Sequence, residues 1–293
     1  MISVIITSFK EPEIIGRAIK AVLQNKTKRK YEVIVAAPDE PTAQVIKKYV
    51  KKDKRVSYFR DKGKGKVGAL NELFVKVKSE ILILTDGDVW MDENAIEELA
   101  KALEDKQVGC VTGRPVAAND KNTMLGYWSH LLVDAGAHKI REKLNKQNKF
   151  IECSGYLFAF RNKIRKIPVD VAEDSIIPYL LWKQGYKIKY VPEAKVYVKY
   201  PNNLKDFIKQ KVRTTKSHER LKLYAPDFPT VKSFTNELTK GPLEAIKYPK
   251  KIKEVIWTLC LFPVRLYIWY KAEKQRKSGK TYQDNWERIE STK

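Results

Sequence analysis

The stretch Glu80-Ile81-Leu82-Ile83-Leu84-Thr85-Asp86-Gly87-Asp88-Val89-Trp90 decides the fold. Its apolar run has the length of a buried strand, and two carboxylates one residue apart follow it. In an open α/β sheet, ligands bind just beyond the carboxyl ends of the strands. We therefore expect Asp86 and Asp88 to hold a hard divalent cation and a diphosphate, with Gly87 supplying the turn. The alternative is an acidic turn that caps the next helix, because so short a motif also arises by chance.

Strand-like runs alternate with amphipathic helical patterns around this stretch. We expect strands at residues 2–7, 31–37, 56–59 and 81–84, separated by helices that start at Pro12 and cover 41–52 and 67–78. Further elements are a helix at 93–103, a strand at 108–116, a long helix at 123–144, a strand at 150–160, a helix at 173–184, an extended segment at 186–200 and a helix at 203–223. This rhythm predicts an α/β fold with a mostly parallel central sheet and helices on both faces.

The composition favours a folded protein with an anionic partner. The 293 residues include 43% hydrophobic ones, and 58 Lys and Arg against 35 Asp and Glu give a net charge of +23. Because the basic residues are spread over the whole length, a compact nucleic-acid patch is not indicated. Cys110, Cys153 and Cys260 lack zinc or disulfide spacing, and the chain starts with a strand-like run. These features predict free thiols, no secretory leader and a cytoplasmic catalytic part.

The composition shifts after residue 224, which predicts a catalytic domain at 1–224 and a helical, membrane-associating segment at 225–293. Within the apolar stretch 252–270, the uncharged core covers only 255–264, short of the ~20 residues of a spanning helix. Trp257, Tyr267 and neighbouring lysines are residue types of the headgroup region. An interfacial helix on the cytoplasmic face of an anionic membrane fits this pattern, and a core helix packed on the catalytic domain is the alternative.

The loop Gly63-Lys64-Gly65-Lys66-Val67-Gly68 matches the dinucleotide fingerprint G-x-G-x-x-G literally. An NAD(P)-dependent oxidoreductase is therefore one alternative function. The three residues between strand and loop, and the lysines in the loop, favour a loop that holds a nucleotide phosphate. The net charge supports a second alternative, a non-enzymatic nucleic-acid-binding protein.

Further candidates lie in the second half of the chain. Glu173 and Asp174 are adjacent acids at a helix start, and we favour Asp174 as a general base because neighbours on a helix point in different directions. Gln210 and Arg213 share a helix face, where the Arg213 guanidinium could pair with a diphosphate. The histidines, which lack metal-ligand spacing, are interpreted as structural or surface residues: His130, His138 and His218.

The joint order of these motifs resembles glycosyltransferase family 2, in particular its cellulose-synthase-like and dolichyl-phosphate-sugar branches. The motifs are Ile5-Ile6-Thr7-Ser8-Phe9-Lys10-Glu11-Pro12, Gly65-Lys66-Val67-Gly68-Ala69-Leu70-Asn71, Asp86-Gly87-Asp88, Ser154-Gly155, Glu173-Asp174 and Gln210-x-x-Arg213. The resemblance covers about residues 1–223 and implies a GT-A fold with inverting transfer from a UDP- or GDP-linked sugar.

The resemblance also implies roles for individual residues. The nucleotide sugar would be bound by Thr7, Ser8, Glu11, Asp39, Lys66, Asp86 and Gln210. Asp88, with Asp86, would hold Mn²⁺ or Mg²⁺, Asp174 would be the base, and Arg213 would stabilise the leaving diphosphate. The acceptor would be a lipid-linked or membrane-held glycan, and no nucleic-acid partner is expected.

Two departures from the family pattern modify these expectations. The second strand ends in Ala36-Ala37-Pro38-Asp39 instead of an acid-rich Asp-Asp-Gly-Ser, which weakens the role of Asp39. Thr214 follows Arg213 where the family usually has a tryptophan that helps to hold the acceptor in polymerising members. Non-processive transfer is therefore expected.

Overall fold

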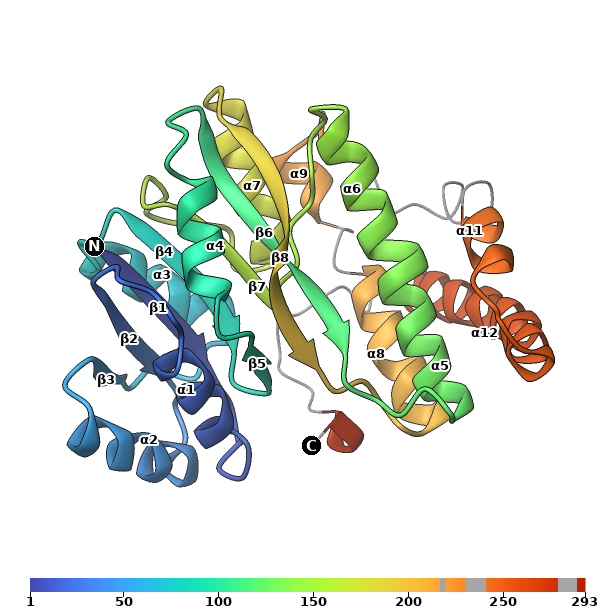
Figure 1. The fold of residues 1–293 in the computed structure, drawn as a ribbon, viewed down its shortest axis with the longest axis horizontal. Helices are drawn as coiled ribbons and strands as arrows, with labels where there is room; N and C mark the ends of the chain where they lie inside the picture. The colour runs from blue at the N-terminus through green and yellow to red at the C-terminus, as the bar shows by residue number, and fades with distance from the viewer. Residues whose placement is uncertain (217–219, 230–240, 279–288, 293) are drawn as a thin grey trace.

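The computed structural model describes residues 1–216, 220–229, 241–278 and 289–292. Within these residues, one eight-stranded sheet forms the centre and helices cover both of its faces (Figure 1). In spatial order the strands are β3 (Val56–Phe59), β2 (Tyr31–Ala36), β1 (Ile2–Thr7), β4 (Ile81–Asp86), β7 (Leu157–Arg161), β6 (Val108–Ala117), β8 (Lys187–Val198) and β5 (Val89–Met91).

The first half of the sheet is parallel, as predicted. β1 pairs with β2 and β4, and β2 pairs with β3, all in parallel register. The connecting helices are α1 (Ile15–Leu23), α2 (Glu40–Lys52) and α3 (Lys66–Lys76). β1 is buried on both faces because helices cover both sides of it. Val4 and Ile6 belong to the apolar cluster that contains α1, while Ile5, which points to the other face, belongs to the cluster that contains α3.

β7 runs antiparallel to both β4 and β6, so its first residues lie beside the carboxyl end of β4. Thr85 pairs with Leu157 there, while Ile81 pairs with Arg161 at the other end. The strand predicted at 150–160 is therefore wrong in its first half. The backbone N–H of Cys153 donates to the carbonyl of Asp174, and that of Ser154 donates to the Thr112 hydroxyl, instead of joining a strand ladder.

The remaining helices pack on the second half of the sheet or on one another. They are α4 (Ala95–Ala102), α5 (Met124–Leu131), η1 (Leu132–His138), α6 (Lys139–Lys146), α7 (Glu173–Lys183), α8 (Leu204–Lys216), α9 (Leu221–Tyr224), α11 (Gly241–Lys247), α12 (Ile252–Lys277) and the short η2 (Glu290–Thr292). The helix predicted at 203–223 ends at Lys216; residues 217–219 lie outside the described part of the chain.

The long helix predicted at 123–144 contains a π-helical stretch, η1, between α5 and α6 (Figure 1). Asp134 lies in this wider stretch, where its carboxylate accepts hydrogen bonds from Arg114 of β6 at 3.2 Å and from the Tyr248 hydroxyl at 3.0 Å. A period of 3.6 residues predicts the helix but not the extra residue per turn, because a π-helix depends on such tertiary partners.

A separate apolar cluster joins α5, α8 and α12. Trp128, Phe207 and Leu261 are buried in it. The indole N–H of Trp128 donates to the Trp257 carbonyl at 2.6 Å, and the hydroxyls of Tyr127 and Thr258 lie 2.8 Å apart. α12 is thus fixed to the body of the protein. Along the described helices, none combines the length and the apolar run that crossing a bilayer requires.

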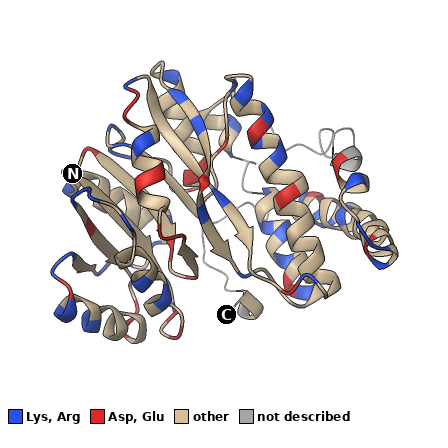
Figure 2. Cartoon of the chain, viewed as in Figure 1, with Lys and Arg blue, Asp and Glu red and all other residues tan. Residues whose placement is uncertain are grey.

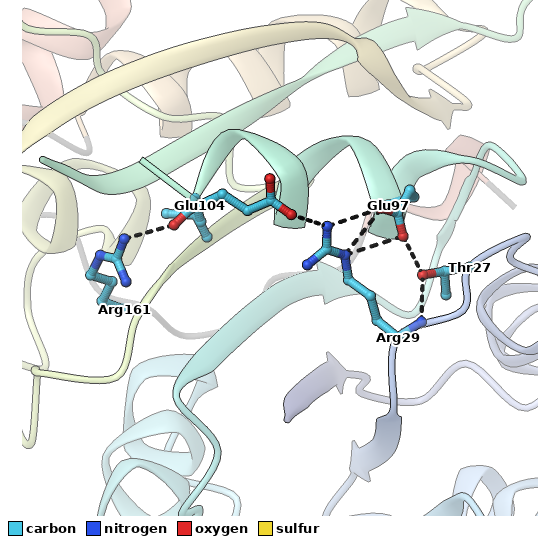
Figure 3. Close-up of polar contacts among 6 residues, drawn as sticks. Thr27, Arg29, Glu97, Glu104 and Arg161 are labelled. Carbon is cyan, nitrogen blue, oxygen red and sulfur yellow. Dashed lines mark hydrogen bonds and ion pairs between the residues drawn. The ribbon is translucent and has the colours of Figure 1, made fainter. Parts of the chain in front are cut away.

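A polar cluster connects the loop after α1 to α4 (Figure 3). The Arg29 guanidinium binds the Glu97 carboxylate through two of its nitrogens, at 3.0 and 3.1 Å, and reaches Glu104 at 2.6 Å. The Thr27 hydroxyl donates to Glu97 at 2.5 Å, and Arg161 of β7 donates to the backbone carbonyl of Leu103 at 2.6 Å. These contacts hold α4 against the sheet.

The Lys and Arg residues are spread from α2 to α12 (Figure 2), consistent with the scatter seen in the sequence. The thiols of Cys110 and Cys153 are free and buried, with 3.4 Å between their sulfur atoms, while the free Cys260 is exposed. His130 contacts the Asn119 carbonyl and His138 contacts the Tyr190 hydroxyl. His218 lies outside the described residues.

Candidate active site

The predicted site residues of β1 and β4 meet at one edge of the sheet. Thr7 and Asp86 are the last residues of these strands and are paired in register. The Thr7 hydroxyl lies 3.4 Å from the Asp86 carboxylate, and the Gly87 N–H donates to the Thr7 carbonyl at 2.9 Å. The carboxyl ends of parallel strands therefore bring the first and the fourth strand to the same point.

Gly87 permits a close approach of two loops. A Cβ atom at this position would lie 2.6 Å from the Ser8 hydroxyl and 2.7 Å from the Glu11 carboxylate. Those two groups are themselves hydrogen-bonded at 2.6 Å. Glycine is required here because any side chain would push the loop after β1 away from the Asp86–Asp88 turn.

Asp39 fixes the neighbouring loop. It caps α2 by accepting hydrogen bonds from the N–H and the hydroxyl of Thr42, at 3.1 and 2.7 Å, and it also accepts the N–H of Lys10 at 2.8 Å. Burial alone would raise the pKa of Asp39, but these hydrogen bonds outweigh it and lower the pKa below its ordinary value. Asp39 thus stays ionised and holds the loop that carries Ser8 and Glu11.

Lys66 lies at the centre of the site. It starts α3 directly after Gly65, whose φ of 85° is in the region that favours glycine. The Lys66 side chain is buried, with its ammonium group 2.5 Å from Asp86 and 2.6 Å from Glu173. Burial opposes the charge, but the two carboxylates outweigh it, so the pKa of Lys66 is raised well above its ordinary value. Lys66 therefore remains a cation.

The site carries an excess of negative charge around Asp88. Burial and, after it, the charge of Asp86 raise the pKa of Asp88 to about 6, although Lys66 and Arg213 act in the opposite direction. The pKa of Asp86 is also raised, first by burial and then by Glu173. A divalent cation between Asp86 and Asp88 would relieve this repulsion, so the two residues fit the predicted metal.

The described residues contain no group of three or more His, Cys, Asp and Glu side chains that could enclose a metal. Asp86 and Asp88 alone would leave most coordination positions of a divalent cation to other oxygen ligands. Such partial coordination is typical of Mg²⁺ sites in which substrate phosphates complete the shell.

The adjacent acids of α7 point to different partners. Asp174 accepts the backbone N–H of Gly155 at 3.0 Å, whereas Glu173 binds Lys66. A Cβ on Gly155 would lie 3.2 Å from the Asp174 carboxylate, so this loop too is closely packed. Of these two candidates the sequence favoured Asp174 and gave Glu173 no role, whereas the buried lysine brings Glu173 into the same cluster.

Tyr156 is a second residue that sequence reasoning missed. Burial, and after it the charges of Asp88 and Asp86, raise the pKa of its phenol. Its carbonyl accepts the Thr85 hydroxyl at 2.8 Å. The signal in the sequence was its position directly after Ser154-Gly155, where the strand pattern is interrupted.

Gln210 and Arg213 lie on α8, which approaches the site from the side of α12. The positive charge of Arg213 opposes the rise in the pKa of both Asp88 and Tyr156. The side-chain oxygen of Gln210 is buried and has no hydrogen-bond partner among the described residues. α8 thus adds the charge of Arg213 to the cluster of carboxylates.

The glycine loop lies next to the loop after β2. Gly63 has a φ of 68°, and a Cβ there would lie 3.6 Å from Pro38. The Gly63 N–H donates to Asp61, a buried acid at the end of β3 whose pKa is raised mainly by burial. β1, β2, β3 and β4 all end in this region, and each contributes polar groups.

A comparison with protein families identifies the family to which the chain belongs. The profile of the family described as Glycosyl transferase family 2 matches residues 3–167, more than half of the chain. The chain belongs to glycosyl transferase family 2. This membership sets aside the oxidoreductase and nucleic-acid-binding alternatives.

Curated relatives of this glycosyltransferase are similar over most of its length. An N-acetylglucosaminyltransferase of Rhizobium meliloti (strain 1021) is 22% identical over 242 residues, which are 74% of this chain and 55% of the relative. A poly-beta-1,6-N-acetyl-D-glucosamine synthase of Staphylococcus aureus (strain COL) is 24% identical over 277 residues, 91% of this chain and 64% of the relative. The chain thus spans less than two thirds of either relative.

A solved structure shares the fold of the glycosyltransferase. The mannosyltransferase PcManGT from Pyrobaculum calidifontis, in complex with GDP-Man and Mn²⁺, superimposes with a TM-score of 0.59 at 16% identity. The match covers 97% of this chain and 84% of that one. The predicted GT-A fold is confirmed by this similarity.

Proposed function

We propose that this chain transfers a sugar with inversion from a UDP- or GDP-linked donor to a lipid-linked or membrane-held acceptor, one sugar at a time. The observation that carries the proposal is the cluster at the end of β4. In it, Lys66 links Asp86 to Glu173, Asp174 packs against Gly155, and the Arg213 charge reaches Asp88.

The nucleotide would lie over the ends of β1, β2 and β4. At this edge Thr7 is hydrogen-bonded to Asp86, Ser8 to Glu11, and Asp39 to the backbone N–H of Lys10. Lys66 is paired with Asp86. Asp86 and Asp88 would hold Mn²⁺ or Mg²⁺, which when bound offsets the charge of the donor diphosphate. Gln210, on the same helix as Arg213, would also bind the donor.

Transfer breaks the bond between the sugar anomeric carbon and the diphosphate oxygen while an acceptor oxygen attacks from the opposite face. Asp174 would take the proton of an acceptor hydroxyl, and the Arg213 guanidinium would stabilise the charge of the departing diphosphate. In-line attack inverts the configuration. An acceptor phosphate would already be a nucleophile and would need Asp174 less.

The division of the chain at residue 224 is part of the proposal. Residues 1–224 would carry the chemistry, and residues 225–293 would keep the enzyme at the cytoplasmic face of a membrane. The cysteine spacing, which indicates neither a disulfide framework nor a zinc site, supports a reducing compartment. Thr214, in place of the family's tryptophan, supports single transfers.

The test is hydrolysis and transfer of nucleotide sugars by the purified full chain with Mn²⁺ or Mg²⁺. UDP-N-acetylglucosamine comes first because two relatives are named for that sugar, and GDP-mannose second because PcManGT was solved with it. Activity should require the metal and be abolished in Asp88→Asn. Asp105→Asn, in the turn before β6 and away from the carboxylate cluster, is the matched control.

The acceptor class follows from a second variant. Asp174→Asn should abolish transfer to a hydroxyl and leave transfer to a lipid phosphate near normal. A fully active Asp88→Asn enzyme would refute the proposed site, and hydrolysis of no nucleotide sugar by the wild type with either metal would refute the proposed function.

A further inference from the structure

One face of α12 is apolar and exposed along most of the helix. Ile252 is 83% exposed and Leu259 is 59% exposed, although large aliphatic side chains are normally buried. We call this surface the outer stripe of α12. Its members are Ile252, Val255, Ile256, Leu259, Cys260, Pro263, Leu266, Tyr267 and Tyr270.

The outer stripe is a continuous band because its members recur at helical spacing. At 100° per residue they fall within an arc of roughly 140°, and the buried residues Leu261, Ile268 and Ala272 lie on the opposite side. Positions 252 to 270 extend about 27 Å along the axis at 1.5 Å per residue. α12 is therefore apolar on both sides, and only one of them is packed against the protein.

The outer stripe is held rigidly. The hydrogen bonds from Trp128 and Tyr127 reach α12 at Trp257 and Thr258, on its inner side. The helix is thus already folded and oriented before anything binds to the stripe. An exposed apolar band of this size marks an interaction site.

Positive charge surrounds the outer stripe. Exposed lysines precede and follow it: Lys247, Lys250, Lys251, Lys253 and Lys274. The two acids of α12 do not offset them at the surface. Glu254 is buried and accepts the Lys250 N–H at 2.7 Å, and Glu273 is paired with Arg276 at 2.6 Å.

These features select among possible occupants. A second copy of the chain would place one lysine rim against another, which is unfavourable. An anionic bilayer surface complements both the apolar band and the lysines, and Tyr267 and Tyr270 are side chains that settle at the headgroup level. We propose that the outer stripe of α12 binds the surface of an anionic membrane, with the helix axis in the membrane plane.

This docking surface deepens the location given in the proposed function without depending on its chemistry. α12 packs on α8, the helix that carries Gln210 and Arg213, through Leu261 and Phe207 (Figure 1). The membrane would therefore lie on the side of α12 that faces away from α8, at a fixed distance from Asp86 and Asp88. Vesicle binding and sugar transfer can succeed or fail independently.

The experiment is co-sedimentation of the full chain with vesicles. Vesicles of phosphatidylcholine with 30% phosphatidylglycerol, roughly the anionic fraction that attracts basic segments, are compared with phosphatidylcholine alone. We expect binding to the anionic vesicles, weakened by salt. The double variant Ile256→Glu/Leu259→Glu should bind about a hundredfold more weakly, because each aliphatic side chain that is withdrawn from the bilayer costs about tenfold.

Val75→Glu is the matched control, because Val75 is 72% exposed on α3 and lies outside the outer stripe. It should bind vesicles like the wild type, and thermal unfolding should show that all variants fold. Lack of wild-type binding to anionic vesicles, or equal binding by the double variant and the control, would overturn the proposal. The proposal would also be overturned if light scattering showed a wild-type dimer that dissociates only in the double variant, while that variant still binds vesicles.

Discussion

Replacing Asp88 with asparagine should stabilise the metal-free protein at neutral and alkaline pH. The pKa of Asp88 is raised from 3.8 to about 6, mainly by burial and by the charge of Asp86. A carboxyl whose pKa is higher in the folded state binds its proton more tightly there than in the unfolded chain. Its ionisation therefore destabilises the folded state, and this cost is complete above about pH 6 and absent below about pH 4.

The size of the effect follows from the shift. Two pKa units at about 1.4 kcal/mol each give about 3 kcal/mol as an upper bound. The side chain of Asp88 is partly exposed to solvent, which reduces this to about 1–2 kcal/mol. In a domain of this size, 1 kcal/mol changes the melting temperature by roughly 2–4 °C. Asp88→Asn should therefore melt about 2–8 °C above the wild type at pH 8.

The assay is thermal unfolding in EDTA between pH 4 and pH 8. The difference between Asp88→Asn and the wild type should shrink to zero as the pH falls through 6 to 4. Asp105→Asn, whose parent carboxyl has a lowered pKa because of hydrogen bonds from Gln107 and Lys189, should gain nothing at pH 8. Addition of Mn²⁺ with a nucleotide diphosphate should reverse the order, stabilising the wild type and not Asp88→Asn. A variant that melts below the wild type at pH 8 in EDTA, or a difference independent of pH, would refute the charge argument.

Three further substitutions test other contacts. Gly87→Ala should lower stability by about 1–3 kcal/mol and weaken donor binding, because its Cβ would lie 2.6 Å from the Ser8 hydroxyl; unchanged melting and binding would contradict this. Arg29→Ala should cost about 1 kcal/mol in urea unfolding, less at high salt, since the bond to Glu97 is partly exposed; an unchanged midpoint would argue against the cluster. Trp128→Phe removes a buried hydrogen bond to the α12 backbone and should cost about 1–2 kcal/mol while speeding amide exchange in α12; equal exchange would show that the bond does not hold the helix.

The alternating pattern was sufficient to predict the parallel half of the sheet. The strands at 2–7 and 56–59 match β1 and β3 at both ends. β1 is a buried run of strand-forming residues. β3 is a short, partly exposed edge strand with residue types that favour strands. The reversal of β7 could not be predicted in the same way. Strand direction depends on which neighbours pair, and neither Ser154 nor Gly155 carries that information locally.

The acids of the site could be found from the sequence, but their pairing could not. Asp86 and Asp88 stand at a strand end, and Lys66 follows a glycine loop, so each position was predictable. The link from Lys66 to Glu173 joins residues far apart in the chain, and only the tertiary packing that brings the start of α7 to the start of α3 creates it. The same holds for Asp134, whose partners on β6 and beyond α11 determine the π-helical stretch.

The reversed direction of β7 separates the two turns at its ends. The turn before it supplies Gly155 and Tyr156 to the carboxylates, whereas the turn after it, at 162–166, lies at the opposite margin of the sheet with Lys163 and Lys166 exposed. A reporter group attached at Lys163 would therefore not obstruct binding of the donor. Sequence drift and short insertions should accumulate in that second turn, while any lengthening of the first would displace the groups that face Asp86.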